Sequence, residues 1–455
     1  MGYRIERDTM GEVRVDENRL FGAQTQRSLE NFKIGEDRMP REVILAIIRI
    51  KLACARANAR LVPDRMTEEK LSAIEHAAEE LLSGELWDEF PLSVYQTGSG
   101  TQTNMNVNEV IANFGNRLVG RRLLHPNDDV NMSQSSNDVF PSAMHVSAVC
   151  AMASLLVALD GLITAFCELE TRSQGIVKCG RTHLQDATPI AFSQEVSGWR
   201  ATLEVDRGLV AGAMTPLLKL AIGGTAVGTG LNAPKDFDKE TTRELSQLLG
   251  HAFVPDENKF HALSAKSEIC NAHGALKTLA CDLVKIANDI RWLASGPRTG
   301  LGEITIPENE PGSSIMPGKV NPTQCEAVTM VAARVMGNDT TITFGASQGN
   351  FELNVYMPVT IYSFLSSARL LTDVMASFTK NCVCRITANS EKMRTNLYNS
   401  LMTSTALTPY IGYDNTAAAV HLAHEKNMTL KEAVLSLGLM SEEDFDKHYR
   451  PEEMI

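Results

Sequence analysis

The sequence predicts a mainly α-helical protein in which a central bundle of about five long helices is flanked by two smaller domains. Three observations support this fold class. Helical apolar patterns fill the middle of the chain, strand signals are weak throughout, and 44% hydrophobic with 22% charged residues suits a globular chain of 455 residues with a large core. We expect an N-terminal domain at residues 1–135, the bundle at 136–388 and a C-terminal domain at 389–455.

The first 135 residues mix short elements with loops. Helical patterns occur at Val43–Leu61 and Glu68–Leu82, and a further helix is expected after the polar stretch Thr97–Asn104 because apolar residues then recur at helical spacing. From about Thr387 the chain returns to shorter elements.

Between these parts the helical patterns become long. Several exceed the usual globular length, which favours a bundle over compact domains. Pro141 is tolerated only near a first turn, so the first bundle helix should begin close to Asn137. The predicted bundle helices are Asp138–Arg172, Pro189–Leu220, Lys259–Ala294, Pro322–Phe344 and Asn354–Phe378.

Charge and cysteine content limit the possible partners and compartments. The net charge of -12 argues against nonspecific nucleic-acid binding, and it requires a local positive site for any anionic substrate. The nine cysteines are scattered without a C-x-x-C pair, and the N-terminal residues lack a secretory pattern. We therefore expect reduced thiols and a cytoplasmic location.

The segment Val146–Phe166 is apolar enough to raise the question of a membrane span. Asp160 and many small residues interrupt it, so a buried bundle helix explains it better and no membrane partner is expected. Long helices with little polar surface predict more burial than one chain provides, hence an obligate oligomer. A thick monomeric bundle is the alternative.

Four polar clusters precede predicted helices, at residues 97–104, 133–138, 180–186 and 312–322. In the third cluster, Thr188 and Pro189 would serve as cap and first helical position. Capping is the simpler interpretation of each cluster alone. Four clusters with more hydroxyls and amides than capping needs suggest that several helix N-termini converge on a small anion with more than one carboxylate.

The segment Gly312–Pro322, called the serine loop below, is the most informative of the four. Its glycines suit a loop that opens and closes over a ligand, Lys319 supplies a point charge, and Asn321 supplies an amide donor. Asn321 as N-cap and Pro322 at the first helical position predict a helix start. An ordinary flexible loop before a capped helix is the alternative.

Three further residues or groups are candidates for chemistry. His183 lies in a polar segment and is the best acid/base candidate of the ten histidines, although a structural role is the alternative. Glu326, one turn into the next helix, either compensates the helix dipole or tunes an acid/base partner. The run His125–Asp129 includes a proline and is too tightly spaced for a preformed metal site, so a turn or an anion contact is expected there and no metal.

Together these motifs resemble the class II fumarases of the fumarase/aspartase superfamily. Ser313–Pro322 resembles the superfamily signature loop. Gln102, after Gly100-Thr101, and Ser136 resemble fumarases, because aspartases typically have Ser-Val after the Gly-Thr and Thr in place of Ser136. Met132 and Ser142 depart from the common Lys and Thr, and neither is a family catalytic position. The stretches that resemble fumarase in particular are Thr97–Asn108, His125–Ser136, Gly180–Pro189 and Gly349–Asn354.

The resemblance implies reversible hydration of fumarate to L-malate through a carbanion (aci-carboxylate) intermediate, in the tricarboxylic acid cycle and without a cofactor. It implies that Ser313 takes the carbon-bound proton and that His183, supported by Glu326, handles the proton of water. It also implies a homotetramer whose active sites are shared by three subunits. An aspartate ammonia-lyase and a non-catalytic structural relative are the alternatives.

The resemblance also assigns two sets of binding residues. The implied second anion site consists of His125, Pro126, Asn127 and Asp128. The implied substrate-binding residues are Ser99, Gly100, Thr101, Ser135, Ser136, Asn137, Thr182, Ser314, Lys319, Val320 and Asn321.

Overall fold

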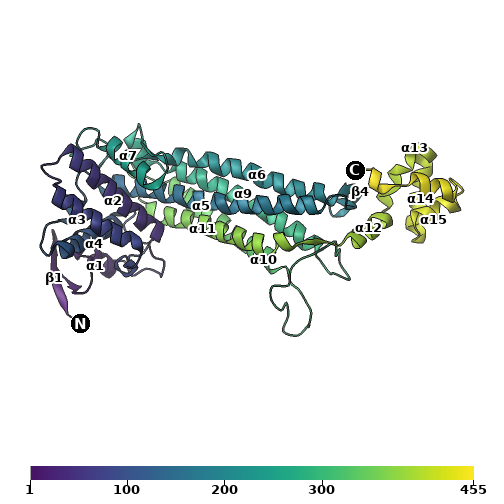
Figure 1. Ribbon diagram of the computed structural model, residues 1–455, viewed down its shortest axis with the longest axis horizontal. Coiled ribbons are helices and arrows are strands. Elements are labelled where there is room, and N and C mark those ends of the chain that lie inside the picture. The colour runs from purple at the N-terminus through teal and green to yellow at the C-terminus, as the bar shows by residue number, and fades with distance from the viewer. Residues whose placement is uncertain (1) are drawn as a thin grey trace. The chain divides into compact units, whose positions relative to one another are not determined.

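The computed structural model describes residues 2–455 and confirms a mainly helical protein (Figure 1). Its α-helices are α1 (Ala23–Asn31), α2 (Arg41–Leu61), α3 (Glu68–Ser83), α4 (Thr101–Val119), α5 (Ser136–Arg172), α6 (Phe192–Met214), α7 (Phe237–Leu249), α8 (Lys259–Ser264), α9 (Ser267–Leu293), α10 (Thr323–Ala346), α11 (Met357–Asn381), α12 (Ser390–Asn399), α13 (Thr408–Ile411), α14 (Tyr413–Lys426), α15 (Leu430–Ser436) and α16 (Glu442–His448). The strands form two-stranded sheets, which pair β1 (Tyr3–Asp8) with β2 (Gly11–Asp16), β3 (Val177–Thr182) with β4 (Gln185–Ala191), β5 (Lys219–Leu220) with β6 (Val254–Pro255), and β7 (Ile304–Thr305) with β8 (Thr387–Ala388).

The packing divides the chain into two compact units. Each of the five longest helices among residues 2–455 (α5, α6, α9, α10 and α11) begins in one unit and ends in the other. The predicted domains at 1–135, 136–388 and 389–455 stay a prediction. Unit 1 consists of Met1–Val157, Gly208–Ala280 and Val331–Thr372, and unit 2 consists of Ala158–Arg207, Cys281–Met330 and Asp373–Ile455.

In unit 1, α2 packs against α3, α4 and α7 (Figure 1). Val43, Ile47 and Ile50 recur at helical spacing and are fully buried, which explains why this segment forms a helix with one face in the core. The predicted helices at Val43–Leu61 and Glu68–Leu82 are confirmed as α2 and α3.

In unit 2, an aromatic cluster forms part of the core. Trp199 on α6 is 1% exposed, and its ring meets those of Phe166 and Phe192 edge-on, with centroids 5.9 and 6.4 Å away. Its indole Nε1 donates a hydrogen bond to Asp289 on α9 at 3.0 Å, so the polar end of the buried ring is satisfied. A smaller hydrophobic core beneath α14, α15 and α16 includes Val434 and Phe445.

The predicted helix Pro189–Leu220 is wrong at both ends. Residues Gln185–Ala191 form strand β4, which pairs with β3, and α6 spans only Phe192–Met214. Pro189 is buried opposite Cys179 in this ladder. The Thr188-Pro189 dipeptide that resembles a helix start therefore lies in a hairpin, where tertiary packing overrides the local signal.

The predicted helix Lys259–Ala294 is broken into α8 and α9. The break occurs where the buried Lys266 ammonium donates hydrogen bonds to the carbonyls of Ala262, Leu263 and Ala265 at 3.4, 3.0 and 2.6 Å. Carbonyls at a helix C-terminus lack intrahelical partners, and this lysine satisfies them.

The remaining bundle helices agree closely with the prediction. Helix α5 begins at Ser136, next to the expected Asn137, and α10 begins at Thr323, one residue after the predicted Pro322. Helix α11 begins at Met357 rather than at Asn354, because the Asn354 amide donates to the carbonyls of Gly345 and Gln348, both at 2.9 Å.

Helix α5 is long and apolar enough to cross a membrane when judged by length and composition alone. The core helices of globular proteins share this composition. In its most apolar window 44% is buried within the chain.

Glycines at both ends of α4 have left-handed backbone conformations. Gly100, the N-cap, has φ 73°, and a Cβ there would lie 2.2 Å from a ring carbon of Phe140. Gly120, the C-cap, has φ 74°, and its Cβ would meet nothing within 4 Å. The two positions share the same backbone strain and differ in the available space.

Replacing Gly100 with Ala should destabilise the protein more than replacing Gly120 with Ala. The left-handed conformation costs about 1–2 kcal/mol for Ala at either position, and overpacking against Phe140 adds about 1–3 kcal/mol at Gly100 alone. Urea unfolding of both variants and the wild type measures the difference. Equal midpoints for the two variants would contradict the close packing at Gly100.

Candidate functional site

The first two polar clusters meet in unit 1. The Ser99 and Thr101 hydroxyls lie 2.9 Å apart where α4 begins. On the first turn of α4, Asn104 Nδ2 donates a hydrogen bond to Ser136 Oγ at 2.9 Å, which brings this turn against the N-terminus of α5. The structure thus places hydroxyls from segments 99–101 and 135–136 beside two adjoining helix N-termini, where anions are favoured.

The N-terminus of α5 is capped from both directions. Ser135 Oγ accepts from the backbone N–H of Asn137 at 3.2 Å, while Asp138 accepts from the N–H of Ser135 at 2.9 Å. The other Asp138 oxygen accepts from the N–H groups of Gly223 and Thr225, each at 2.9 Å. Burial raises the Asp138 pKa to about 6, although these three donors oppose the shift.

A buried lysine binds two side chains, Asn131 and Gln134, that precede the N-terminus of α5. Lys51 on α2 is 1% exposed, and its Nζ donates to the side-chain oxygens of Asn131 at 2.8 Å and Gln134 at 2.9 Å. The sequence interpretation missed this residue. A lysine within the apolar run of α2 is a signal that could have found it, because a fully buried lysine requires polar partners.

His125 begins a short turn of residues 126–130. Its Nδ1 accepts from the backbone N–H groups of Asn127 at 3.3 Å and Asp128 at 3.2 Å. A nitrogen that accepts these bonds is not available as a metal ligand. Among residues 2–455, no three His, Cys, Asp or Glu side chains group as metal ligands. The second anion site stays a prediction.

His183 lies at the tip of the β3–β4 hairpin, which corrects the prediction that its cluster precedes a helix. His183 and Leu184 form the two-residue turn, and their φ values of 56° and 59° are those of a type I′ turn. Thr182, His183 and Leu184 are exposed in the single chain. The hairpin therefore presents the histidine outward on a rigid support.

A buried ionic cluster holds the base of this hairpin. The Arg181 guanidinium donates to both oxygens of Glu303, at 2.7 and 3.1 Å, and Lys178 lies 3.1 Å from the same carboxylate. Burial pushes the Glu303 pKa up, but the Arg181 hydrogen bonds and the Lys178 charge outweigh it and hold the pKa below its ordinary value. Glu303, which the sequence interpretation also missed, connects the His183 hairpin to the segment that leads into the serine loop.

Two hydrogen bonds close the neck of the serine loop. The Gly312 N–H donates to the Lys319 carbonyl at 3.0 Å, and the Gly312 carbonyl accepts from Asn321 Nδ2 at 2.6 Å. The Asn321 amide thus closes the loop instead of capping α10, whose first backbone bond runs from Glu326 N–H to the Pro322 carbonyl at 3.1 Å. Glu326 lies in the first turn of α10, as predicted.

The Ser313 hydroxyl accepts two backbone hydrogen bonds. Its Oγ accepts from the backbone N–H groups of Ile315 at 3.2 Å and Met316 at 3.1 Å. Two N–H donors are thus aimed at one oxygen, an arrangement that favours negative charge there. The adjoining Ser314 and Lys319 are exposed in the single chain.

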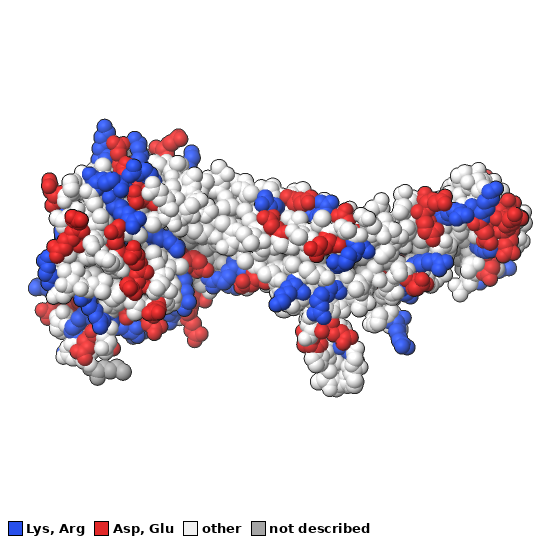
Figure 2. Space-filling model, in the orientation of Figure 1, with Lys and Arg blue, Asp and Glu red and all other residues white. Residues whose placement is uncertain are grey.

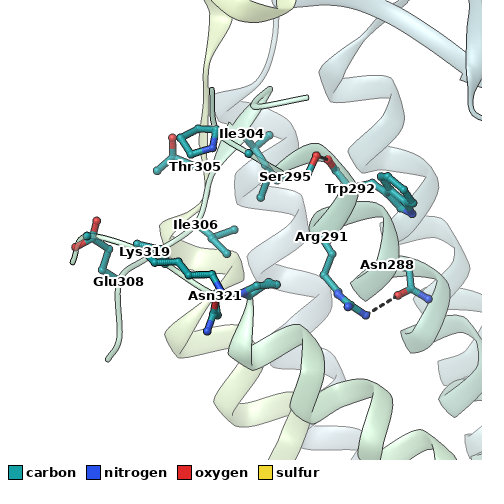
Figure 3. Close-up of a pocket in the computed structure, with 16 residues that line it drawn as sticks. Asn288, Arg291, Trp292, Ser295, Ile304, Thr305, Ile306, Glu308, Lys319 and Asn321 are labelled. Carbon is teal, nitrogen blue, oxygen red and sulfur yellow. Dashed lines mark hydrogen bonds between the residues drawn. The ribbon is translucent and has the colours of Figure 1, made fainter. Parts of the chain in front are cut away.

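A cavity of about 640 Å³ in unit 2 is lined by Lys319, Val320 and Asn321 (Figure 3). Across it, Arg291 and Asn288 extend from α9 and are joined by a hydrogen bond of 3.2 Å. A second cavity, of about 330 Å³, is lined by Ser313 and other residues of the loop. Both are large enough for a four-carbon diacid and have donors in their walls.

The single chain brings some predicted site residues together and leaves others apart. The clusters at 97–104 and 133–138 adjoin in unit 1. In unit 2, within the described residues 2–455, no hydrogen bond joins the His183 hairpin to the serine loop. The roles assigned to these residues stay predictions.

Comparisons with known proteins identify the family. Residues 11–337 match the lyase family and residues 404–455 match the fumarase C C-terminus. The class II fumarate hydratases of Helicobacter pylori strain J99 and Bacillus subtilis are each 56% identical to this chain, and the matches cover 100% of this chain and 99% of each relative.

Solved structures of related enzymes have the same fold as this chain. A class II fumarase from Schistosoma mansoni matches with a TM-score of 0.95 and 41% identity, over 100% of this chain and 99% of that one. A fumarate lyase:delta crystallin from Brucella melitensis, bound to cobalt, matches with a TM-score of 0.95 and 38% identity over the same shares. The chain belongs to the class II fumarase family.

Proposed function

We propose that this protein is a fumarate hydratase, which adds water reversibly to fumarate to give L-malate. The observation that carries this function is 56% identity to class II fumarate hydratases over the full length of the chain. An aspartate ammonia-lyase is not favoured by these relatives, nor by Gln102 and Ser136. A non-catalytic relative is also disfavoured, because Ser313 and His183 are both present.

The geometry of the serine loop fits the removal of a carbon-bound proton. In the direction of dehydration, Ser313 as an alkoxide takes the proton from the carbon beside a malate carboxylate, and the electron pair moves into that carboxylate. Lys319 and Asn321 are the donors proposed to stabilise the resulting aci-carboxylate. The backbone N–H groups at Ser313 Oγ lower the cost of forming the alkoxide.

The second half of the reaction expels hydroxide from the neighbouring carbon. His183, with a water molecule between it and the substrate, is proposed to supply the proton that converts this hydroxide to water. Glu326 is proposed to support His183. Substrate binding is proposed for the following residues: Ser99, Gly100, Thr101, Ser135, Ser136, Asn137, Thr182, Ser314, Lys319, Val320 and Asn321.

We also propose a homotetramer in which three subunits complete each site. The hairpin tip Thr182–Leu184 and the loop residues Ser314–Lys319 support this, because within residues 2–455 both segments are exposed to solvent. Figure 2 shows few charged side chains over part of the bundle. Apolar side chains are exposed on the long helices, and the burial of such residues drives association. They include Val157 (72%), Val205 (64%), Met330 (67%) and Phe344 (59%).

The proposed setting is the cytoplasm and the tricarboxylic acid cycle. All nine cysteines are free thiols, which favours a reducing compartment. The interconversion of fumarate and L-malate is the reaction that the cycle requires of this enzyme class.

The purified protein should consume fumarate without ammonium. Hydration removes the double bond conjugated to the two carboxylates, so the ultraviolet absorbance of fumarate should fall and L-malate should form. Addition of ammonium should not change the rate. A reaction that requires ammonium and forms aspartate would contradict the hydratase function.

Replacing His183 with Asn should lower kcat about 10²- to 10⁴-fold, because a positioned acid/base group is lost. The matched control is His421→Asn, at an exposed histidine of α14 in the same unit. Steady-state kinetics with fumarate and with L-malate measure both variants. Unchanged kcat in His183→Asn would remove this histidine from the mechanism.

Light scattering of the purified protein should give a mass four times that of the 49.8 kDa chain. The exposed apolar residues of the long helices are the reason, since a tetramer buries them. Full hydratase activity in a particle with the mass of one chain would contradict the shared-site arrangement.

A further inference from the structure

We propose that Lys51 is a positioning residue for dicarboxylate binding, which fixes the hydrogen-bond direction of a buried asparagine network so that the Ser136 hydroxyl donates to the substrate. This inference rests on the proposed function, because it takes Ser136 as a substrate-binding residue. The inference assigns a role in substrate binding to Lys51, a buried residue of α2 that does not itself contact the substrate.

The direction of the network begins at the lysine. An ammonium group donates hydrogen bonds and cannot accept them. Lys51 Nζ lies 2.8 Å from Asn131 Oδ1 and 2.9 Å from Gln134 Oε1, so both amides must turn their oxygens toward it. Lys51 therefore holds the Asn131 oxygen, while Asn131 Nδ2 donates on the other side to the Gln134 carbonyl at 3.2 Å.

Asn131 passes this orientation to α4. Its Oδ1 also accepts from the Nδ2 groups of Asn104 and Asn108, both at 3.2 Å. If Asn104 were rotated to exchange its nitrogen and oxygen, two amide oxygens would face each other. Within residues 2–455, Asn104 Oδ1 is buried without a hydrogen-bond partner. An unpaired buried acceptor is unfavourable, which indicates that the contacts of Nδ2 impose this orientation.

The network ends at the predicted site. Asn104 Nδ2 also reaches Ser136 Oγ at 2.9 Å, and because Nδ2 donates, Ser136 must accept. Across residues 2–455, Ser136 Oγ takes part in this one hydrogen bond. Its own proton is therefore left for a further acceptor, and a substrate carboxylate is such a group.

The positive charge of Lys51 should also favour binding of an anionic substrate. Burial lowers the pKa of Lys51 to about 7, partly offset by the nearby Cys54 and Asp138. Carboxylates on the elements packed around α2 bind other partners: Glu75 and Glu244 bind arginines of α2, Glu240 binds Arg60, Asp129 binds Lys70, and Glu109 binds residues of segment 22–25. Asp138 is thus the carboxylate that acts most directly on the lysine.

These facts set the sign of the pH dependence. A dianion bound at Ser135–Asn137 favours the protonated lysine, so by linkage protonated Lys51 favours binding. As the pH rises through about 7, the lysine loses its charge and the neutral amine can accept as well as donate, so it holds the Asn131 oxygen less firmly. KM for fumarate should therefore rise with pH above this range.

Lys51→Met tests the inference, with Lys266→Met as the matched control. Both lysines are 1% exposed, and burial lowers the pKa of each to about 7. Within residues 2–455, the hydrogen bonds of the Lys266 ammonium go to backbone carbonyls at the end of α8. Steady-state kinetics of the full-length enzyme between pH 6 and 9 should give a KM for Lys51→Met that is about tenfold higher or more below pH 7, with kcat little changed.

The KM of Lys51→Met should also lose its rise with pH, whereas Lys266→Met should follow the wild type. A wild-type KM and pH profile in Lys51→Met would overturn the inference while leaving the hydratase function intact. Absence of fumarate hydration in the wild type would instead overturn the proposed function, and this inference with it.

A second variant covers the case in which Lys51→Met fails to fold. Asn104→Asp has the same size, but its carboxylate cannot donate to Ser136 and would attract the Ser136 proton. KM should again rise about tenfold or more at unchanged secondary structure. A folded Asn104→Asp enzyme with the wild-type KM would also overturn the inference.

Discussion

The polar turn of unit 1 depends on the buried carboxylate of Asp138, which accepts hydrogen bonds from the backbone of Ser135, Gly223 and Thr225. One buried group therefore joins the start of the longest helix to the segment that follows β5. Such a carboxylate is costly to bury, and its three N–H donors are what stabilise it there. The polar turn beside it can keep its hydroxyls available because the backbone is held by Asp138.

Unit 2 also contains a buried carboxylate that holds a polar segment in place. Glu303, fully buried, binds Arg181 and Lys178 and so fixes a β-hairpin rather than a helix N-terminus. In both units a buried carboxylate engages the backbone or the flanking residues of a polar segment, which is half-buried at Ser135–Asn137 and exposed at Thr182–Leu184. A rigid support of this kind keeps short polar side chains within small tolerances, as preorganised binding requires.

The sequence was sufficient to predict α2, α5 and α10, because buried apolar residues recur there at helical spacing. It was insufficient at the His183 segment. There the turn depends on positive φ at His183 and Leu184, which neither residue type signals, and Thr188-Pro189 resembles a helix start. Lys51 was overlooked because its partners, Asn131 and Gln134, are far away in sequence and meet it only through the packing of α2.

The five helices that run through both units have a consequence for dissecting the protein. A boundary drawn between the units would cut α10 after its first eight residues, Thr323–Met330, and would cut the other four within their length. Each cut would expose backbone groups that the intact helices satisfy. A fragment that contains one unit alone should therefore fold poorly, because it would carry five incomplete helices.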